Sequence, residues 1–252
     1  MPVYQSQERL TKKKKRVLKQ DGVLDSNNQI SSGFAISRAI QPMTENQGIA
    51  FDAWDDGANL MLHGIAGTGK TFLALYFALK EVMTKGSYHK KVYIIRSTVP
   101  SRDMGFLPGS QKEKMRVYEG PYYDIAMKLF GRGDAYEILK HRNTVEFIST
   151  SFLRGSTFDD CILVVDEVQN MSDQELHTVM TRVGENCKII FCGDVKQDDL
   201  TSERKKEMSG LRTFMKIIKN MREFDFIEFV ADDIVRSKLV KSYIIERDRQ
   251  GL

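Results

Sequence analysis

One segment of the chain reads Gly64-Ile65-Ala66-Gly67-Thr68-Gly69-Lys70-Thr71 and matches the pattern G-x-x-x-x-G-K-[S/T] at every defined position. The apolar run 59–63 before it predicts a buried strand, and an apolar stripe at helical spacing follows it over 71–84. Glycines between a strand and a helix let backbone amides and the positive helix end surround phosphate oxygens. The whole loop is therefore expected to bind ATP, with Lys70 reaching the β- and γ-phosphates during catalysis and the Thr71 hydroxyl holding magnesium. A purely structural glycine loop is the weaker alternative, because both flanking elements are of the required type.

A second apolar strand, 161–166, runs directly into the carboxylate pair Asp166-Glu167. In a nucleotide hydrolase, we expect Asp166 to bind magnesium and Glu167 to orient or deprotonate the attacking water. The second carboxylate favours hydrolysis over transfer of the phosphoryl group to a small molecule, because water is a poor nucleophile. The alternative is a surface turn that follows a core strand.

A third apolar strand, 188–192, ends in Gly193-Asp194 and is followed by Gln197. Asp194 and Gln197 are expected to detect the γ-phosphate or the attacking water. A Gly-Asp turn after a strand is common, so the pattern gains weight only because two phosphate motifs precede it.

The remaining elements alternate between strands and helices, which predicts an α/β fold with a mainly parallel sheet covered by helices on both faces. Ligands of such sheets bind outside the carboxyl ends of the strands, where all three motifs fall. Thr44 and Ser172 are expected to cap two of the helices, and Glu175 completes a capping box with Ser172. The further predicted helices are 45–54, 121–130, 172–182, 210–219 and 237–247, the further strands are 92–96, 145–149 and 224–229, and 97–118 is predicted to be a long loop.

Composition places these elements in a single domain. The chain has 252 residues, of which 41% are hydrophobic and 29% charged, enough for one large α/β core. We expect a flexible basic N-terminal segment over 1–40 and an ATPase domain over 41–252. The cluster Lys12–Arg16 is interpreted as a solvated arm or, alternatively, as a tail that touches nucleic acid; the net charge of +4 permits either.

The three cysteines, Cys161, Cys187 and Cys192, form no C-x-x-C pair and flank or lie inside apolar runs. They are expected to be reduced, buried and inert, as in a cytoplasmic protein. The N-terminus shows no secretory signal, and no apolar stretch approaches the ~20 residues of a transmembrane helix.

Together, the three motifs resemble the ATPase core of superfamily-one helicases, and the segment Pro42 to Gln47 is similar to the one whose glutamine reads adenine, which would be Gln47 here. The chain resembles the PhoH-like family still more closely, over about residues 40–245. The resemblance implies a RecA-like P-loop fold, ATP hydrolysis and action on RNA. Two departures are Ser97, where proline is expected, and Ser156, where many members have a second arginine. The matching positions are Arg96, Gly105–Gly109, Lys112, Lys114, Arg154-Gly155, Thr157-Phe158, Asp166–Asn170, Thr181-Arg182, Gly184, Asp233 and Val235-Arg236.

The size of the chain predicts an oligomer. Superfamily-one helicases have two cores, and the second supplies an arginine finger, which is worth a factor of ~10³–10⁵ in rate. A single core has to receive that arginine from a neighbour, so we expect a homo-oligomer, a hexameric ring, with Arg154, Arg182 or Arg236 as the finger. Each of them has an alternative reading as a surface or salt-bridge arginine.

The loop 96–116 predicts a nucleic-acid surface, because basic groups with aromatic neighbours can follow a backbone and stack bases. We expect single-stranded RNA or DNA as the partner and a helicase-like activity; the alternative is a loop that packs on its own subunit. The residues concerned are Arg102, Lys112, Lys114 and Arg116, with Phe106 and Tyr118. The competing functions are a nucleotide-dependent switch or assembly protein acting on a protein partner, and a small-molecule kinase, which Glu167 disfavours.

Overall fold

The computed structural model describes residues 34–37, 39–98, 111–153, 155, 157–194 and 210–250, with the backbone alone for 111–114. These residues form a six-stranded sheet in the order β3-β2-β4-β5-β1-β6, with every neighbouring pair parallel. The strands are β1 (Asn59–Gly64), β2 (Lys91–Arg96), β3 (Val145–Ser149), β4 (Cys161–Asp166), β5 (Lys188–Gly193) and β6 (Phe224–Phe229).

Strand β5 lies between β1 and β4, so the first two sequence motifs are not on adjacent strands. Ile190 of β5 is opposite Leu60 of β1 on one side and Val164 of β4 on the other. The carboxyl ends of the three strands therefore meet at one edge of the sheet, with the end of β5 in the middle. This arrangement confirms the predicted fold class, a RecA-like P-loop α/β fold.

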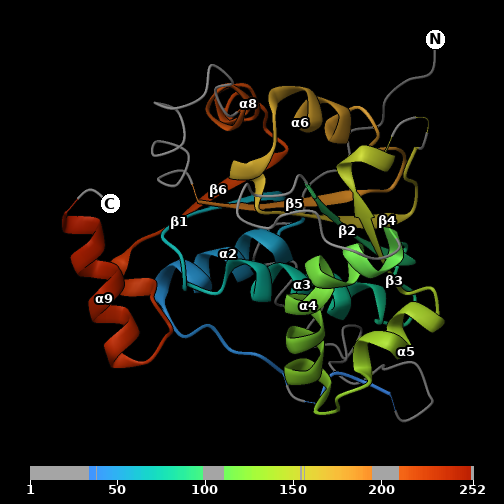
Figure 1. Ribbon diagram of the computed structural model, residues 1–252. Helices are drawn as coiled ribbons and strands as arrows, with labels where there is room; N and C mark the ends of the chain where they lie inside the picture. The colour runs from blue at the N-terminus through green and yellow to red at the C-terminus, as the bar shows by residue number, and fades with distance from the viewer. Residues whose placement is uncertain are drawn as a thin grey trace.

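Helices cover both faces of the sheet, as Figure 1 shows. One face carries α2 (Glu45–Asp55), α3 (Lys70–Val82), α4 (Gln111–Phe130) and α5 (Ala135–His141), and the other carries α6 (Asp173–Met180) and α8 (Leu211–Ile218). The short helices are η1 (Thr150–Phe152), η2 (Val168–Asn170) and η3 (Ala231–Asp233), and the last helix is α9 (Lys238–Arg249). Thr44 caps α2 and the Ser172–Glu175 capping box begins α6, as predicted.

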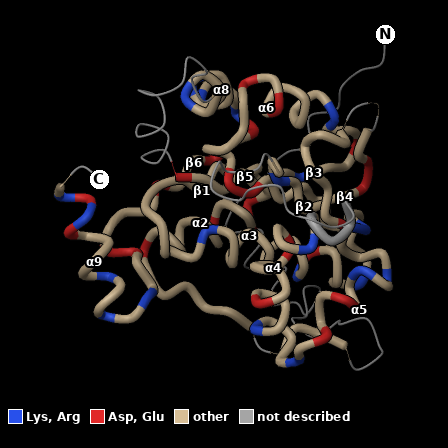
Figure 2. The backbone as a smooth tube through the Cα atoms, viewed as in Figure 1, with Lys and Arg blue, Asp and Glu red and all other residues tan. Residues whose placement is uncertain are grey.

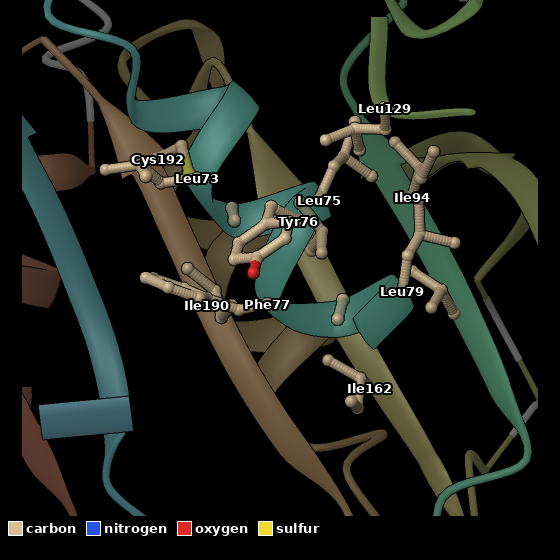
Figure 3. Close-up of a cluster of buried hydrophobic side chains, with 14 of the residues drawn as sticks. Leu73, Leu75, Tyr76, Phe77, Leu79, Ile94, Leu129, Ile162, Ile190 and Cys192 are labelled. Carbon is tan, nitrogen blue, oxygen red and sulfur yellow. The ribbon is translucent and has the colours of Figure 1, made fainter. Parts of the chain in front are cut away.

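Strand β4 shows why the sheet needs two helical layers. Each of its residues is buried, and alternate side chains point to opposite faces. Ile162 and Val164 pack in the core beneath α3, whereas Leu163 and Val165 belong to the core beneath α6 and α8. Figure 3 shows the first of these cores, where α3 places Leu75 and Leu79 against Ile94 and Ile162.

This core gives a direct stability prediction. Leu79 is 2% exposed, so replacing it with alanine leaves a cavity and is expected to lower the free energy of unfolding by about 2–5 kcal/mol. The matched control is Leu239→Ala on α9, where leucine is 80% exposed and the expected change is within about 0.5 kcal/mol. Urea unfolding of both variants measures the difference; equal midpoints would contradict this account of the core.

The long loop predicted over 97–118 is wrong from residue 111 onward. Helix α4 begins at Gln111, ten residues before Pro121, and contains that proline. The sequence 111–119 consists mostly of good helix formers, and the prediction gave Pro121 too much weight as a helix start. The short helix α5 was also missed. Residues 99–110, with Arg102 and Phe106, lie outside the described part of the chain, as do the side chains of Lys112 and Lys114.

The packed structure includes residues of the segment expected to be loosely attached. Phe34 is 4% exposed and stacks on Phe130 with ring centroids 4.5 Å apart. The backbone amide and the hydroxyl of Ser37 both donate to the carbonyl oxygen of Leu129, at 2.8 and 2.9 Å. Core contacts therefore begin by Phe34, before the expected boundary at residue 40; Lys12–Arg16 lies outside the described residues.

No helix in the described ranges is long and apolar enough to cross a membrane. The longest of them, α4, has 20 residues but carries charged side chains such as Arg116, Glu119 and Lys128 along its length.

Candidate functional site

The loop between β1 and α3 depends on glycine at three positions with positive φ. Gly64, Gly67 and Gly69 have φ of 113°, 81° and 88°, a region that side chains disfavour. A Cβ on Gly64 would also collide with the backbone carbonyl of Phe229 in the neighbouring strand. The loop can therefore wrap closely only with this glycine pattern, and Gly69 then starts α3 as its N-cap.

Two segments outside the loop hold it in place. The Gln47 side-chain amide donates to the carbonyl oxygen of Thr68 at 3.1 Å, and its Oε1 accepts from the backbone amide of Met43 at 2.9 Å. On the other side, the backbone amide of Val235 donates to the carbonyl oxygen of Gly67 at 3.2 Å. Gln47 thus connects the loop to the start of α2, and Val235 connects it to the segment that leads into α9.

Lys70 is folded back onto the loop. Its Nζ donates to the carbonyl oxygens of Gly64 and Ile65 at 2.8 and 2.7 Å. Burial lowers the pKa of Lys70, and the nearby carboxylate of Asp194 offsets part of that effect. The ammonium is therefore positioned where phosphate oxygens, rather than carbonyls, would compensate its charge better.

Asp166 lies at the centre of the site and is 3% exposed. Its Oδ1 accepts from the hydroxyl of Thr71 at 2.8 Å, and its Oδ2 accepts from the hydroxyl of Tyr122 at 2.9 Å. Burial raises the pKa of Asp166, as does the neighbouring Glu167, while both hydroxyl donors oppose the rise. A nearby cation would offset the negative charge of this buried carboxylate.

Arg96 supplies part of that positive charge at the end of β2, opposite Asp166 in the sheet register. Burial alone lowers the pKa of Arg96, but Tyr122, Glu167 and Asp166 outweigh it and hold the pKa above its ordinary value. The guanidinium also lies over the ring of Tyr118, 5.9 Å from its centroid.

Gln169 connects Glu167 to the end of β5. Its side-chain amide donates to Oε2 of Glu167 at 2.5 Å, and its Oε1 accepts from the backbone amide of Asp194 at 3.1 Å. Glu167 has φ of 55°, an uncommon value for a residue with a side chain. Gly193 permits the close approach, because a Cβ there would collide with the side chain of Val168. The carboxylate of Glu167 is thereby held at the same sheet edge as the glycine loop Gly64–Thr71, the phosphate loop.

The predicted residues fall into four groups, of which Arg182 alone forms the last. The structure brings together Lys70, Thr71, Asp166, Glu167 and Asp194 at one edge of the sheet. Gln47 contacts the loop through Thr68, and Arg236 lies against Gly67 of its own chain, with its Cγ 3.1 Å from where a Cβ of Gly67 would be. Arg154 and Gln197 lie outside the described residues.

Arg182 lies at the opposite edge of the sheet. Its carbonyl oxygen accepts from the amide of Phe158 at 2.9 Å, just before β4 begins. Its Nε is buried and has no hydrogen-bond partner within the part of the chain that the structure describes. The distance between the two edges separates Arg182 from the phosphate loop of its own chain.

Sequence reasoning missed four residues of the site. Arg96, Gln169 and Val235 belong to motifs that were noticed, but no role was assigned to them. Tyr122 reaches Asp166 across 44 residues of sequence, and Val235 reaches Gly67 from a far more distant part of the chain, so spacing gave no signal for either. Gln169 was the one whose role the local sequence indicated, because a side chain two residues after Glu167 is close to the strand end.

The oxygen atoms around Thr71 suit a small, hard cation. The described residues contain no cluster of three or more His, Cys, Asp or Glu side chains able to form a complete protein cage. Magnesium does not require one, because it keeps several waters and binds proteins through one or two oxygen ligands. The adjacent hydroxyl of Thr71 and carboxylate of Asp166 fit that preference.

The raised pKa of Asp166 predicts that Asp166→Asn makes the metal-free protein more stable at neutral pH. Below about pH 3.9 the carboxyl is neutral in both folded and unfolded chains and costs nothing. As the pH rises through the folded pKa, the buried charge destabilises the folded state, so the advantage of asparagine grows. Unfolding in EDTA across this pH range measures the difference in the free energy of unfolding between wild type and Asp166→Asn. The control is Asp124→Asn at an exposed position of α4; a difference that stays constant with pH would contradict the prediction.

Comparisons with known proteins point to one family. The family model described as PhoH-like protein matches residues 39–246. A PhoH-like protein of Bacillus subtilis is 36% identical over 189 residues, covering 75% of this chain and 57% of that protein. A PhoH-like protein of Mycobacterium leprae is 32% identical over 210 residues, covering 82% of this chain and 58% of that protein. The chain thus spans little more than half the length of these relatives.

Among solved structures, the UvsW helicase from bacteriophage T4 aligns with a TM-score of 0.47 and 14% identity, covering 87% of this chain and 68% of that one.

Proposed function

The chain belongs to the PhoH-like protein family, and we propose that it is a magnesium-dependent ATPase whose turnover is coupled to single-stranded RNA or DNA. The observation that carries the ATPase proposal is the convergence of Lys70, Thr71, Asp166, Glu167 and Asp194 around one glycine loop. Each of these groups has a defined use in hydrolysing a nucleoside triphosphate, and the loop and its helix end suit an anion.

Binding of ATP begins with an exchange of partners at Lys70. Its ammonium now donates to the carbonyls of Gly64 and Ile65. The β- and γ-phosphate oxygens are stronger acceptors because they are charged, so the side chain turns to them when the nucleotide enters. The loop amides and the amino end of α3 add further donors. Gln47 keeps the loop in shape through Thr68 and is also proposed to read the adenine.

Magnesium, when bound with the nucleotide, supplies positive charge next to the β- and γ-phosphates. Thr71 and Asp166 would hold it. Tyr122 fixes the second carboxylate oxygen of Asp166, so that the first one remains directed at Thr71. Arg96 keeps the surrounding charge balanced at the end of β2.

Glu167 is proposed as the general base for water. A carboxylate that accepts a proton from an attacking water has to be fixed in hydrogen-bond reach of it. Gln169 fixes it, because one amide group holds both the carboxylate of Glu167 and the backbone of Asp194. Asp194 is proposed to detect the γ-phosphate, so that its loss after hydrolysis is transmitted through Gln169. Gln197 is proposed to share that role.

Coupling to nucleic acid is the part of the proposal with a distinct test. Phosphate release from ATP is measured with and without single-stranded RNA and DNA at low salt, where backbone contacts are strongest. Stimulation by either polymer supports the coupled, helicase-like ATPase. An ATPase that ignores both, and binds neither, would instead support a nucleotide-dependent switch that acts on a protein partner.

We also propose a ring of subunits in which Arg182 completes the neighbour's site. Arg182 is remote from its own phosphate loop, and its buried Nε has no partner among the described residues. Arg236, by contrast, lies against its own loop and is proposed to contact the bound phosphates within one chain. Arg154 remains a further candidate for the action between subunits.

Mixed oligomers test the assignment of Arg182. Arg182→Ala is expected to be nearly inactive alone, since an arginine finger is worth ~10³–10⁵ in rate. Glu167→Gln is expected to be nearly inactive alone because it lacks the general base, worth ~10²–10⁴. Mixing them creates sites that combine an intact Glu167 with an intact Arg182 from the neighbour, so activity should return in part. Arg249→Ala on exposed α9 is the control and should keep full activity. A monomer in sedimentation with ATP, or no recovery on mixing, would rule out the arrangement.

A further inference from the structure

Cys161 and Cys187 face each other at the edge of the sheet remote from the phosphate loop. Cys161 begins β4, and Cys187 directly precedes β5, one residue before the opposed pair Ile162 and Lys188. Neighbouring strands lie about 4.8 Å apart, which falls within the Cα separation of about 4.4–6.8 Å found in disulfides. The two Sγ atoms are 3.4 Å apart, in contact but not bonded.

The surrounding backbone holds the two thiols at this distance independently of any bond between them. Phe158 donates its amide to the carbonyl of Arg182 at 2.9 Å and accepts from the amide of Gly184 at 2.8 Å. The amide of Glu185 donates to the carboxylate of Asp159 at 2.8 Å. The segment before β4 and the turn before β5 are thereby locked together, so a bond requires only that the sulfurs approach by about 1.4 Å.

The two thiols differ in exposure and acidity. Cys161 is fully buried, whereas Cys187 is partly exposed, which corrects the expectation that all three cysteines are buried. The hydrogen bond with Cys161 lowers the pKa of Cys187 to about 7, although burial opposes the shift. The same hydrogen bond raises the pKa of Cys161, as does its burial. Cys187 is therefore the thiol that solvent reaches and that ionises first.

We propose that Cys161 and Cys187 form a reversible disulfide, a redox modification site separate from the nucleotide site and independent of the ATPase proposal. The oxidant is a low-molecular-weight disulfide such as oxidised glutathione. The Cys187 thiolate attacks one of its sulfurs and expels a glutathione thiolate, leaving a mixed disulfide on Cys187. Cys161 then loses its proton to the expelled thiolate, and its sulfur attacks the Cys187 sulfur. The second glutathione leaves, so two cysteine thiols are oxidised as one disulfide is reduced to two thiols.

The bond would enclose the segment 161–187, which contains Asp166, Glu167 and helix α6. It would also tie the turn that carries Arg182 to the first residue of β4. Oxidation therefore changes the amino end of β4, at the sheet edge opposite the phosphate loop. The carboxyl end of the same strand carries Asp166.

Thiol mapping of the whole folded chain tests the proposal. Reduced protein is incubated with excess oxidised glutathione, then denatured and alkylated, and its mass and peptides are measured. The expected product has lost two hydrogens, carries no glutathione and is alkylated only at Cys192, which is almost fully buried in the core beneath α3. Dithiothreitol should return all three thiols. Cys192→Ala is the matched control and should still form the bond.

Removing one partner separates a disulfide from a single reactive thiol. In Cys161→Ala, Cys187 should accumulate as the mixed disulfide with glutathione, because no second thiol can displace it. The proposal is overturned if wild type and Cys192→Ala retain three and two free thiols respectively under native oxidation, or if wild type stops at the same glutathione adduct as Cys161→Ala. The wild-type result decides the question even if a cysteine variant does not fold.

Discussion

Glu167→Gln is expected to lower the rate of ATP hydrolysis by ~10²–10⁴-fold while leaving ATP binding almost unchanged, since that range is the usual contribution of a general base. Glutamine has nearly the same shape as glutamate but cannot take a proton from water. It can still accept the hydrogen bond that Gln169 now donates to Glu167, so the end of β4 should keep its conformation. The loss therefore belongs to the chemical step rather than to folding or affinity.

Single-turnover phosphate release measures the chemical step, and binding of a fluorescent ATP analogue measures affinity. The control is Glu185→Gln, an exposed glutamate at the opposite edge of the sheet, which should hydrolyse ATP at the wild-type rate. If Glu167→Gln keeps more than about a tenth of wild-type turnover, well above the general-base range, then Glu167 is not the base.

Lys70→Ala is expected to impair both binding and turnover. Loss of a charge-assisted contact of about 1.5–3 kcal/mol weakens ATP binding by roughly 10–150-fold. Loss of a charge that stabilises the transition state lowers kcat by a further ~10²–10³-fold. Because burial lowers the pKa of Lys70, the empty site gains little from the ammonium, and the variant should fold normally.

The control for Lys70 lies on the same helix. Lys80 is exposed at the last turn of α3, and Lys80→Ala should bind and hydrolyse ATP as the wild type does. Titration with the ATP analogue and steady-state kinetics separate the two effects. Wild-type affinity in Lys70→Ala would mean that the ammonium stays on the carbonyls of Gly64 and Ile65 when ATP binds.

The sequence predicted much of this site because its motifs are local. The glycine loop needs positive φ at fixed spacings, and a buried parallel strand that ends in Asp166-Glu167 is visible as an apolar run that stops at two charges. Three such strand ends must meet at one sheet edge, whatever the strand order. The sequence alone therefore predicts that Lys70, Thr71, Asp166, Glu167 and Asp194 lie together.

What the sequence did not reveal depends on contacts between distant segments. Tyr122 is a tyrosine in a helix until the fold brings its hydroxyl to Asp166, and nothing in the helix pattern distinguishes it. The start of α4 was misplaced because proline marks helix starts more often than helix interiors. The pairing of Cys161 with Cys187 follows from the register of β4 and β5, which spacing alone does not fix.

The backbone hydrogen bond from Val235 to Gly67 ties the glycine loop to the segment that leads into the last helix, α9. Ile244 of α9 lies close to the loop, with its Cδ1 3.3 Å from where a Cβ of Gly67 would be, while Leu239 and Tyr243 are exposed on the same helix. Figure 2 shows basic and acidic residues interspersed along it. Thermodynamic linkage is reciprocal: a molecule that changed ATP affinity by displacing α9 would have its own affinity changed by ATP by the same factor. If the chain works as proposed, a molecule bound to helix α9 and a nucleotide bound to the glycine loop would each change the affinity of the other.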